Sequence, residues 1–447
     1  MLRNTIALSA GLLVMGCVTH PVPIDEELPI IERGAVVDDL NAFLDGVKET
    51  HPDLSYSADL ETIEQKKEEI IRDLPDEMTA REAWMAMATL NPLFKDAHIG
   101  LRRPLNLLEA LGRSDDEQSA PLMTLPVRIP SSDRIEVAVE SAMLPGVTAG
   151  SEIVAINGID SKTILEELLP RMRGESETLG RLILAMRFDA FFWTGFGAFE
   201  RYQIAIEQDG NTVLHDLQAG EASVENAPYG VCQLTPTIAY LDVPSFDISR
   251  EDEFADFLPG AFEQINQREA ITLIIDLREN GGGATELTDR LMAYLTDKPF
   301  AATSSIKARV TEANQGLLPG VPLGTVLDVP FAEVVNPPQD LAHRFPWNTV
   351  ILIGPLTYSQ SIVFTATAID NDVAIIAGHP TEGPANQTAQ VQVIPLENTG
   401  FQALAPLYII TRGSGETGRA VIEPTIPLTR FGDAGLAELV AILSGAN

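Results

Sequence analysis

A serine hydroxyl stands at a predicted strand-to-helix turn in the sequence PLTYSQS, residues 355–361. The apolar run Val350–Gly354 predicts a buried strand before it, and a helical pattern from Ser361 to Asp370 follows. A polar residue at such a turn either caps the helix or takes part in chemistry. Because ligands of open α/β sheets bind at the carboxyl ends of the strands, Ser359 is a candidate nucleophile.

A second strand end carries a bare glycine loop. The apolar segment Ile271–Leu277 runs into RENGGG, residues 278–283, and another helical pattern follows. Glycine N–H groups can point at an anion or at a developing oxyanion, although a purely structural tight turn is the alternative. The loop lacks a Gly-Lys-Ser/Thr ending and a Gly-x-Gly-x-x-Gly pattern, which disfavours a nucleotide site. We expect the amides of Gly281, Gly282 and Gln360 to form an oxyanion hole facing Ser359.

The elements that must position these residues alternate from about residue 235 onward. Short, continuously apolar, β-branched segments predict strands that are buried on both faces, as in a sheet covered by helices. The strands are expected at 238–243, 271–277, 350–354 and 373–377, and the helices at 251–267, 286–296 and 361–370. The fold class is therefore mixed α/β, with residues 223–447 as the catalytic domain.

The part of the chain before residue 223 divides into two regions with different sequence patterns. Residues 31–120 show helical periodicity, including a capping box of Thr79 and Glu82, and predict an N-terminal helical region. Residues 121–222 contain short alternating runs, and GVTAGSEIVAINGIDSK within them resembles a PDZ domain, in which an extended peptide adds a strand to a sheet edge.

The amino terminus has the pattern of a targeting segment. Arg3 is followed by a short apolar stretch that ends in VMGC, which resembles the lipobox of bacterial lipoproteins. That resemblance implies a signal peptide at 1–17, lipidation of Cys17, and a polar, proline-rich tether at 18–30. Val18 after the cysteine favours the outer membrane, so we expect a lipid-anchored protein of the cell envelope. An ordinary signal peptide that happens to contain a cysteine is the alternative.

Charge and cysteine content exclude several partners. The net charge is −34, with 45% hydrophobic residues, which indicates a folded protein that repels nucleic acid and anionic lipid headgroups. Lipidation of Cys17 would leave Cys232 as the one remaining cysteine, so no internal disulfide is expected. No base lies near Cys232 in the sequence, and it is expected to be buried and structural.

These motifs together resemble a known family. The order DLRENGGG at 276–283, TYS at 357–359 and Gly-x-x-Thr-x-Gly at 378–383 is similar to the S41 peptidases, which include the tail-specific or carboxy-terminal processing proteases and the tricorn core. The resemblance covers roughly 235–430. It implies a ClpP/crotonase-like βαβ core with an inserted PDZ-like domain, a serine nucleophile, a peptide or protein substrate and no cofactor.

Three positions depart from the family pattern. Processing proteases place a lysine just after the Gly-x-x-Thr-x-Gly segment, where this chain has Pro384, and no lysine occurs after Lys307. A local Ser–Lys dyad is therefore excluded. The usual small residue and glutamate after the serine are replaced by Gln360 and Ile362.

A histidine is the base that the family's other branch implies. His98 lies in FKDAHIG, residues 94–100, which resembles the Asp-Gly-His segment of the tricorn-type branch. His379, at a predicted strand end, is the alternative base. A third residue that orients the histidine is expected at Glu416 or Glu423, and the sequence does not choose between them.

The sequence thus predicts a lipid-anchored serine endopeptidase. No H-E-x-x-H or similar cluster is present, so no metal site is expected. The alternative function is a catalytically inactive scaffold of the same fold that binds peptide ends or small ligands. Oligomeric state is left open.

Overall fold

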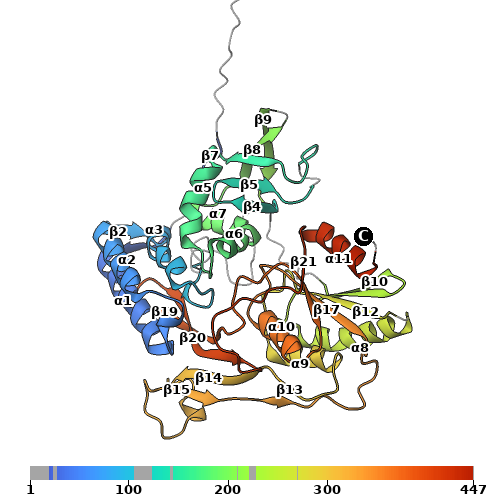
Figure 1. Ribbon diagram of the computed structural model, residues 1–447. Helices are drawn as coiled ribbons and strands as arrows, with labels where there is room; N and C mark the ends of the chain where they lie inside the picture. Colours follow the sequence, from blue (N-terminus) through green and yellow to red (C-terminus); the bar gives the residue numbers. More distant parts are fainter. Residues whose placement is uncertain are drawn as a thin grey trace, which may run out of the picture.

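In the computed structural model, the described residues are 20–23, 28–104, 123–140, 144–208, 210–220, 228–268 and 270–445. The N-terminal helices lie at the left of Figure 1, an inserted domain lies at the top, and a larger α/β domain occupies the lower right. The predicted signal peptide and Cys17 fall outside the described residues.

The N-terminal region is helical, as predicted. It consists of three helices and a short antiparallel pair of strands: α1 (Arg33–Thr50), α2 (Leu60–Asp73), α3 (Ala80–Met87), β1 (Ile30–Glu32) and β2 (Glu77–Thr79). The capping box of Thr79 and Glu82 is present at the start of α3. A 3-10 helix, Ala88–Phe94, then leads to the loop that carries His98.

The inserted domain is built on a six-stranded sheet. Its strands are β4 (Val127–Ser131), β5 (Arg134–Val137), β6 (Glu152–Ile156), β7 (Ile159–Asp160), β8 (Arg201–Gln208) and β9 (Asn211–Gln218). Its helices are α5 (Ser161–Leu168), α6 (Glu177–Met186) and α7 (Phe188–Phe196). The predicted turn at Asn157 and Gly158 joins β6 to β7 with φ values of +51° and +77°, as a tight hairpin turn requires.

The domain predicted to be catalytic, called the catalytic domain below, holds a second six-stranded sheet in the order β10-β11-β12-β17-β18-β21. All neighbours run parallel except β10 and β11. The strands are β10 (Gly230–Thr235), β11 (Ile238–Asp242), β12 (Thr272–Asp276), β17 (Asn348–Ile353), β18 (Ile375–Gly378) and β21 (Ile426–Pro427). The helices are α8 (Glu251–Gln267), α9 (Thr285–Ala293), α10 (Gln360–Asp370) and α11 (Gly432–Leu443).

Both faces of this sheet are covered, which confirms the expectation from the continuously apolar strands. Alternate residues such as Leu273 and Ile275 pack with α8, α9 and α10, while Ile274 packs with α11 on the opposite face. Cys232 on the edge strand β10 is exposed, so the prediction that it is buried was wrong.

A further sheet ties the N-terminal region to the catalytic domain. Its order is β15 (Val326–Pro330), β14 (Thr303–Arg309), β20 (Phe401–Arg412) and β19 (Thr388–Leu396), and β3 (Gly100–Leu101) also pairs with β20. A small pair, β13 (Phe300–Ala301) and β16 (Val334–Val335), lies apart from it. Ala403 and Ala405 of β20 pack in the core beneath α1 and α3. The chain just after His98 is therefore hydrogen-bonded to the C-terminal part of the protein.

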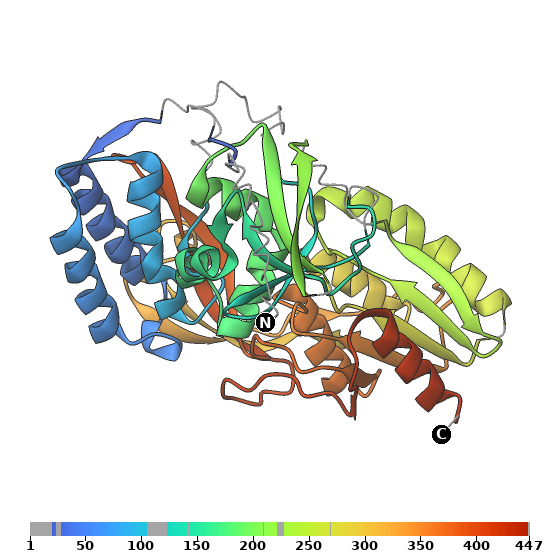
Figure 2. The ribbon, with the colours of Figure 1, turned by 90° about the horizontal axis from the view of Figure 1, so that it is seen from above.

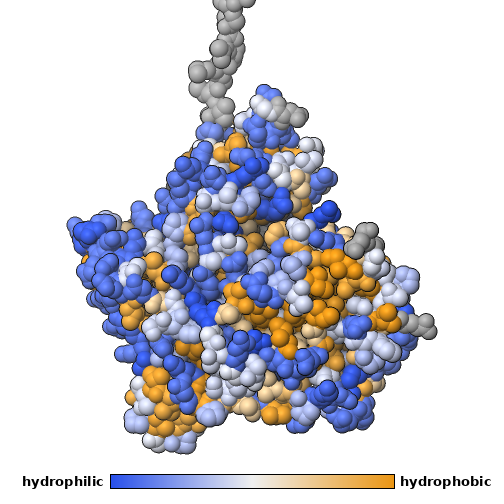
Figure 3. Space-filling view, in the orientation of Figure 1, coloured by the Kyte–Doolittle hydropathy of each residue, from blue (hydrophilic) through white to orange (hydrophobic). Residues whose placement is uncertain are grey.

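The inserted domain lies between the other two parts when seen from above (Figure 2). Trp193 of α7 belongs to the core of the N-terminal region, while the neighbouring Phe192 belongs to the core of the inserted domain. The surface is mainly hydrophilic over the N-terminal helices and the inserted domain, and apolar residues gather toward the catalytic domain near α11 and toward β15 (Figure 3). Among the described residues, no helix combines the length and the apolar character needed to cross a membrane.

Candidate active site

The two predicted loops meet at one edge of the catalytic sheet. Asp276 at the end of β12 lies beside Leu352 near the end of the parallel strand β17, so both loops leave the sheet at the same edge. Tyr358 N–H donates to the Asn280 carbonyl at 3.0 Å, and the Thr357 hydroxyl donates to the Leu277 carbonyl at 2.7 Å. These bonds hold the serine turn against the glycine loop.

Ser359 precedes α10, but its hydroxyl does not cap the helix. Its backbone has φ +51° and ψ −123°, a conformation that residues with a side chain rarely adopt and that costs on the order of 1–3 kcal/mol. The Gln387 side-chain amide donates to the Ser359 carbonyl at 2.8 Å and helps to hold this geometry. The strained turn presents the hydroxyl away from the helix.

His98 faces this hydroxyl. Its Nε2 lies 3.1 Å from Ser359 Oγ, within hydrogen-bond distance, although 261 positions separate the two residues. The imidazole ring packs against Tyr358, with 5.1 Å between ring centroids. The predicted nucleophile and the predicted base are therefore brought together.

A threonine and an aspartate lie behind the histidine. Thr388 Oγ1 donates to Asp96 Oδ2 at 2.8 Å and lies 3.0 Å from His98 Nδ1. Since the threonine proton is directed to the aspartate, Oγ1 must accept from an Nδ1–H group. Nε2 then keeps its lone pair for the Ser359 hydroxyl, as a general base requires.

Asp96 is buried and remains a carboxylate. Burial alone would raise its pKa, but the hydrogen bonds and charge of His98 and the bond from Thr388 outweigh burial and lower the pKa. Its Oδ1 accepts from the His98 backbone N–H at 2.8 Å and lies 3.5 Å from Nδ1. Asp96 thus braces the loop and also fixes the tautomer of His98 through Thr388.

The glycine loop approaches the serine closely. A Cβ atom on Gly282 would lie 2.7 Å from the Ser359 Cβ and 2.8 Å from the Gln360 nitrogen, and one on Gly283 would lie 1.9 Å from the Phe246 carbonyl oxygen. The Gly282 N–H donates to Asn280 Oδ1 at 2.9 Å. Of the predicted oxyanion donors, the Gly282 amide is therefore already engaged within the loop, because the Asn280 side chain turns back onto it.

A residue of the inserted domain also reaches the site. The Tyr358 hydroxyl donates to Glu175 Oε1 at 2.6 Å and accepts from the Ala97 N–H at 3.2 Å. Burial, and then the negative charge of Asp96, raise the pKa of Glu175 to about 7. The Tyr358 ring thus connects the inserted domain, the His98 loop and the serine turn.

The remaining predicted residues lie elsewhere. The Gln360 side chain donates to Thr288 on α9 at 2.9 Å, so only its backbone faces the serine turn. His379 stacks on Phe431 with 3.8 Å between centroids. Glu416 pairs with Arg412 at 3.2 Å, and Glu423 is exposed, whereas Thr388 and Asp96 occupy the far side of the His98 ring.

Two of the three departures from the family pattern are accommodated in the core. Ile362 is fully buried among the side chains that pack α10 onto the catalytic sheet. Pro384 is buried and forms a β-bridge with Val421.

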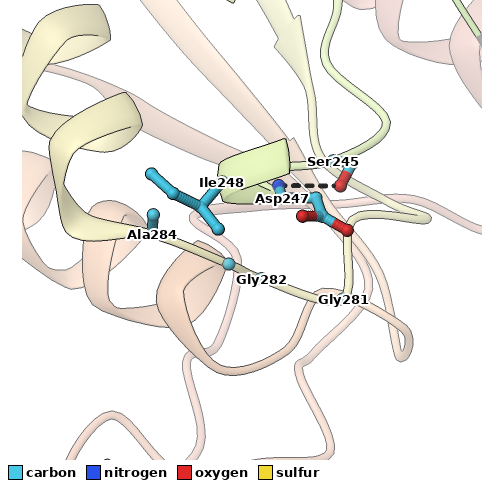
Figure 4. Close-up of a pocket in the computed structure, with 7 residues that line it drawn as sticks. Ser245, Asp247, Ile248, Gly281, Gly282 and Ala284 are labelled. Carbon is cyan, nitrogen blue, oxygen red and sulfur yellow. Dashed lines mark hydrogen bonds between the residues drawn. The ribbon is translucent and has the colours of Figure 1, made fainter. Parts of the chain in front are cut away.

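An open cavity of about 520 Å³ adjoins the glycine loop (Figure 4). It is lined by Ser245, Asp247, Ile248, Gly281, Gly282, Gly283 and Ala284. Gly282 lines this cavity and also approaches the serine closely, since a Cβ on it would lie 2.7 Å from the Ser359 Cβ. Within the described ranges, no group of three or more His, Cys, Asp and Glu side chains is arranged to hold a metal ion.

Sequence reasoning missed three of these contacts. Thr388, Gln387 and Glu175 lie in no recognised motif, and their partners are far away in the chain. Hydrogen bonds across such distances leave no periodic or local signal in the sequence. The one feature of the sequence that pointed to this hydrogen-bond chain was Asp96, which lies two residues before His98.

Comparisons with known proteins agree with this geometry. Residues 237–428 match the model of peptidase family S41. The fold is similar to mature CPAF complexed with lactacystin, at a TM-score of 0.62 and 15% identity over 92% of this chain and 97% of that chain. It is also similar to mature CPAF alone, at a TM-score of 0.61 and 15% identity over 89% and 93% of the two chains. No curated protein matches the sequence.

At 15% identity, the likeness to CPAF shows the fold alone. The match to a peptidase family indicates hydrolysis of peptide bonds. The fold brings Ser359, inside the matched residues, within hydrogen-bond distance of His98, which lies in the N-terminal region. The chain is accordingly a serine-type peptidase, a hydrolase, and its residues 237–428 are similar to the peptidase domain of family S41.

Proposed function

We propose that this protein is an endopeptidase in which Ser359 is the nucleophile and His98 is the general base. The observation that carries the proposal is the 3.1 Å separation between His98 Nε2 and Ser359 Oγ. The strained backbone of Ser359 and the Thr388–Asp96 pair behind the ring support it. Each feature is what an activated serine needs, and none is needed to cap a helix.

The proton moves along a short path in this mechanism. His98 Nε2 takes the Ser359 proton as Oγ attacks the peptide carbonyl, and the ring then carries protons on both nitrogens. The Nδ1–H···Oγ1 bond to Thr388 and the nearby Asp96 carboxylate stabilise that charge. His98 returns the proton to the leaving amine, and water hydrolyses the acyl-enzyme by the same base.

The oxyanion is assigned to backbone amides of the two loops. Gln360 N–H stands at the start of α10, where the helix dipole favours negative charge, and a Cβ on Gly282, the next residue after Gly281, would lie 2.8 Å from that nitrogen. The Gly282 amide is not assigned as a donor, because it is bonded to Asn280. Gly282 instead lacks the side chain that would keep the two loops apart. Loss of one such donor typically costs about 10²- to 10³-fold in turnover.

A fluorophosphonate probe with a general peptide library tests the proposal. The wild-type chain should be labelled at Ser359 and cleave peptides, and Ser359→Ala should lose both, with turnover lower by at least about 10³-fold. His98→Ala should lose nearly as much, whereas His379→Ala should stay close to wild type. Folded wild-type protein that neither reacts with the probe nor cleaves any peptide would instead be a binding scaffold.

We further propose, on the lipobox-like VMGC sequence alone, that the mature chain is anchored to the cell envelope through a lipid on Cys17, at the outer membrane. The described domains would then act on peptides at that membrane. Cys17→Ser, expressed as the full chain in a bacterial host, should move the protein from the membrane fraction to the soluble fraction. Unchanged fractionation would refute the anchor.

A further inference from the structure

We propose that the cavity beside the glycine loop is a substrate subsite that takes a cationic group, with the Asp247 carboxylate as its partner. The proposal rests on the peptidase function proposed above and names the class of substrate: peptides with a positively charged group close to the scissile bond. Lysine and arginine side chains and a free peptide amino group share this chemistry.

The position of the cavity makes it a subsite. Gly281, Gly282 and Gly283 form its wall, and Gly282 approaches the serine turn so closely that a Cβ on it would lie 2.7 Å from the Ser359 Cβ and 2.8 Å from the Gln360 nitrogen. A peptide whose carbonyl is held between the Gly281 and Gln360 amides must therefore pass along this wall. A side chain next to the scissile bond can then enter the cavity, whose volume of about 520 Å³ exceeds that of any amino-acid side chain.

The opposite wall is fixed against the glycine loop by backbone bonds. Phe246 N–H donates to the Gly282 carbonyl at 3.0 Å, and Ala284 N–H donates to the Phe246 carbonyl at 2.7 Å. The next residue along the chain is Asp247, so the carboxylate has a defined place beside the loop. In Figure 4 this carboxylate lies toward the Gly281 end of the wall, and Ile248 lies toward the Ala284 end.

The electrostatic character of the cavity is set by one group. Asp247 is the one ionisable side chain among the residues that line it. A hydrogen bond from the Ser249 backbone lowers the pKa of Asp247, so it carries a negative charge at neutral pH. The nearby cation Arg250 donates two hydrogen bonds of 2.8 Å to Glu253 and lies over the Tyr229 ring, so it is paired with groups other than Asp247.

A bound cation would find complementary surroundings. The carboxylate supplies the charge, the exposed Ile248 can cover the methylene stem of a lysine or arginine side chain, and the Ser245 side chain lies beside Asp247. An acidic side chain would be repelled at the same place. The site is open to solvent, so the preference should be moderate and weakened by salt.

Matched fluorogenic peptides test the inference. Blocked peptides that differ in one residue on either side of the cleaved bond should be cut faster with lysine than with norleucine at one position, by about five- to tenfold in kcat/KM at low salt. Glutamate at that position should be slowest, and the differences should shrink at high salt. A second set, without lysine but with free amino ends, separates side-chain recognition from recognition of the peptide terminus.

The variant Asp247→Asn removes the charge and keeps the fold. Asparagine can still accept the hydrogen bond from the Ser249 N–H, so the 3-10 helix Ile248–Arg250 retains its cap. Asp247→Asn should abolish the lysine preference, so that the variant cleaves lysine and norleucine peptides at similar rates. Asp252→Asn, an exposed change of the same charge in the first turn of α8, is the control and should keep the preference.

The outcomes separate the two proposals. If wild-type protein cleaves norleucine, lysine and glutamate peptides of both sets alike, the subsite is refuted and the peptidase stands. A lysine preference that survives in Asp247→Asn also refutes it. If the wild-type chain neither labels with the fluorophosphonate nor cleaves any peptide, the endopeptidase proposal falls and the subsite falls with it.

Discussion

At the scale of single residues, the site is a chain of hydrogen bonds that fixes one tautomer. The Thr388 hydroxyl donates a hydrogen bond to Asp96, and Thr388 Oγ1 therefore accepts one from His98 Nδ1–H. The Thr388 hydroxyl is the nearer partner of Nδ1, at 3.0 Å, and the Asp96 carboxylate lies at 3.5 Å. Thr388 is thus a positioning residue, because its hydroxyl does not touch the substrate or the reacting atoms.

Replacement of this threonine should separate orientation from packing. Thr388→Val keeps the shape but leaves Nδ1–H without its acceptor, so turnover should fall by about 100-fold with little change in KM. Labelling of Ser359 by the fluorophosphonate should slow in parallel. Thr388→Ser keeps the hydroxyl and serves as the control. Equal turnover in the valine and serine variants would contradict the role given to this hydroxyl.

At the scale of elements, the glycine loop matters for two reasons. It offers N–H groups, and it lacks side chains where it packs closely against the Phe246 backbone and the serine turn. Gly283 has φ +144°, and the Phe246 carbonyl occupies the place where its side chain would be. That contact fixes the wall that carries Asp247. Gly281 has open space on the corresponding side.

Two alanine substitutions should therefore differ sharply in stability. Gly283→Ala must displace the Phe246 backbone, and we expect it to lower the free energy of unfolding by about 3 kcal/mol or more. Gly281→Ala meets no atom within 4 Å and should change stability by less than about 1 kcal/mol. Urea unfolding followed by tryptophan fluorescence measures both. Similar losses in the two variants would show that the loop is not held in this way.

Elements with local signals could be predicted, and long-range pairings could not. The capping box of Thr79, the turn at Asn157 and Gly158, and the strands buried on both faces follow from short-range propensity and periodicity. The approach of His98 to Ser359 needed the family resemblance. Thr388 and Glu175 escaped prediction because each meets its partner through the tertiary fold, and a hydroxyl or carboxylate in a loop or at a strand start has many equivalent uses.

At the scale of the whole molecule, three regions contribute to one site. His98 comes from the N-terminal region, Ser359 from the catalytic domain, and Glu175 from the inserted domain. Arg173 and Ser176 add bonds from the inserted domain to the Ala97 carbonyl at 2.8 Å and to Glu382 at 2.5 Å. The geometry of the site therefore depends on how the regions dock.

Glu175 makes that docking sensitive to pH. Burial and the charge of Asp96 raise its pKa from 4.5 to about 7, and its Oε2 has no hydrogen-bond partner among the described residues. Between these two pH values the folded protein keeps a proton that the unfolded chain releases. Stability contributed by this group is therefore complete below about pH 4.5 and is lost as the pH rises through about 7.

The variant Glu175→Gln should remove this dependence while keeping an acceptor for the Tyr358 hydroxyl. Relative to wild type, it should gain stability as the pH is raised from 5 to 8, by an amount on the order of 3 kcal/mol. Thermal unfolding across that range measures the difference, with the exposed Glu177→Gln as the matched control. If the wild-type and Glu175→Gln curves stay parallel from pH 5 to 8, the carboxyl is ionised throughout. Glu175 would then be an ordinary ionised side chain that accepts a hydrogen bond from Tyr358. It would not be a buried acid that joins the inserted domain to the serine turn.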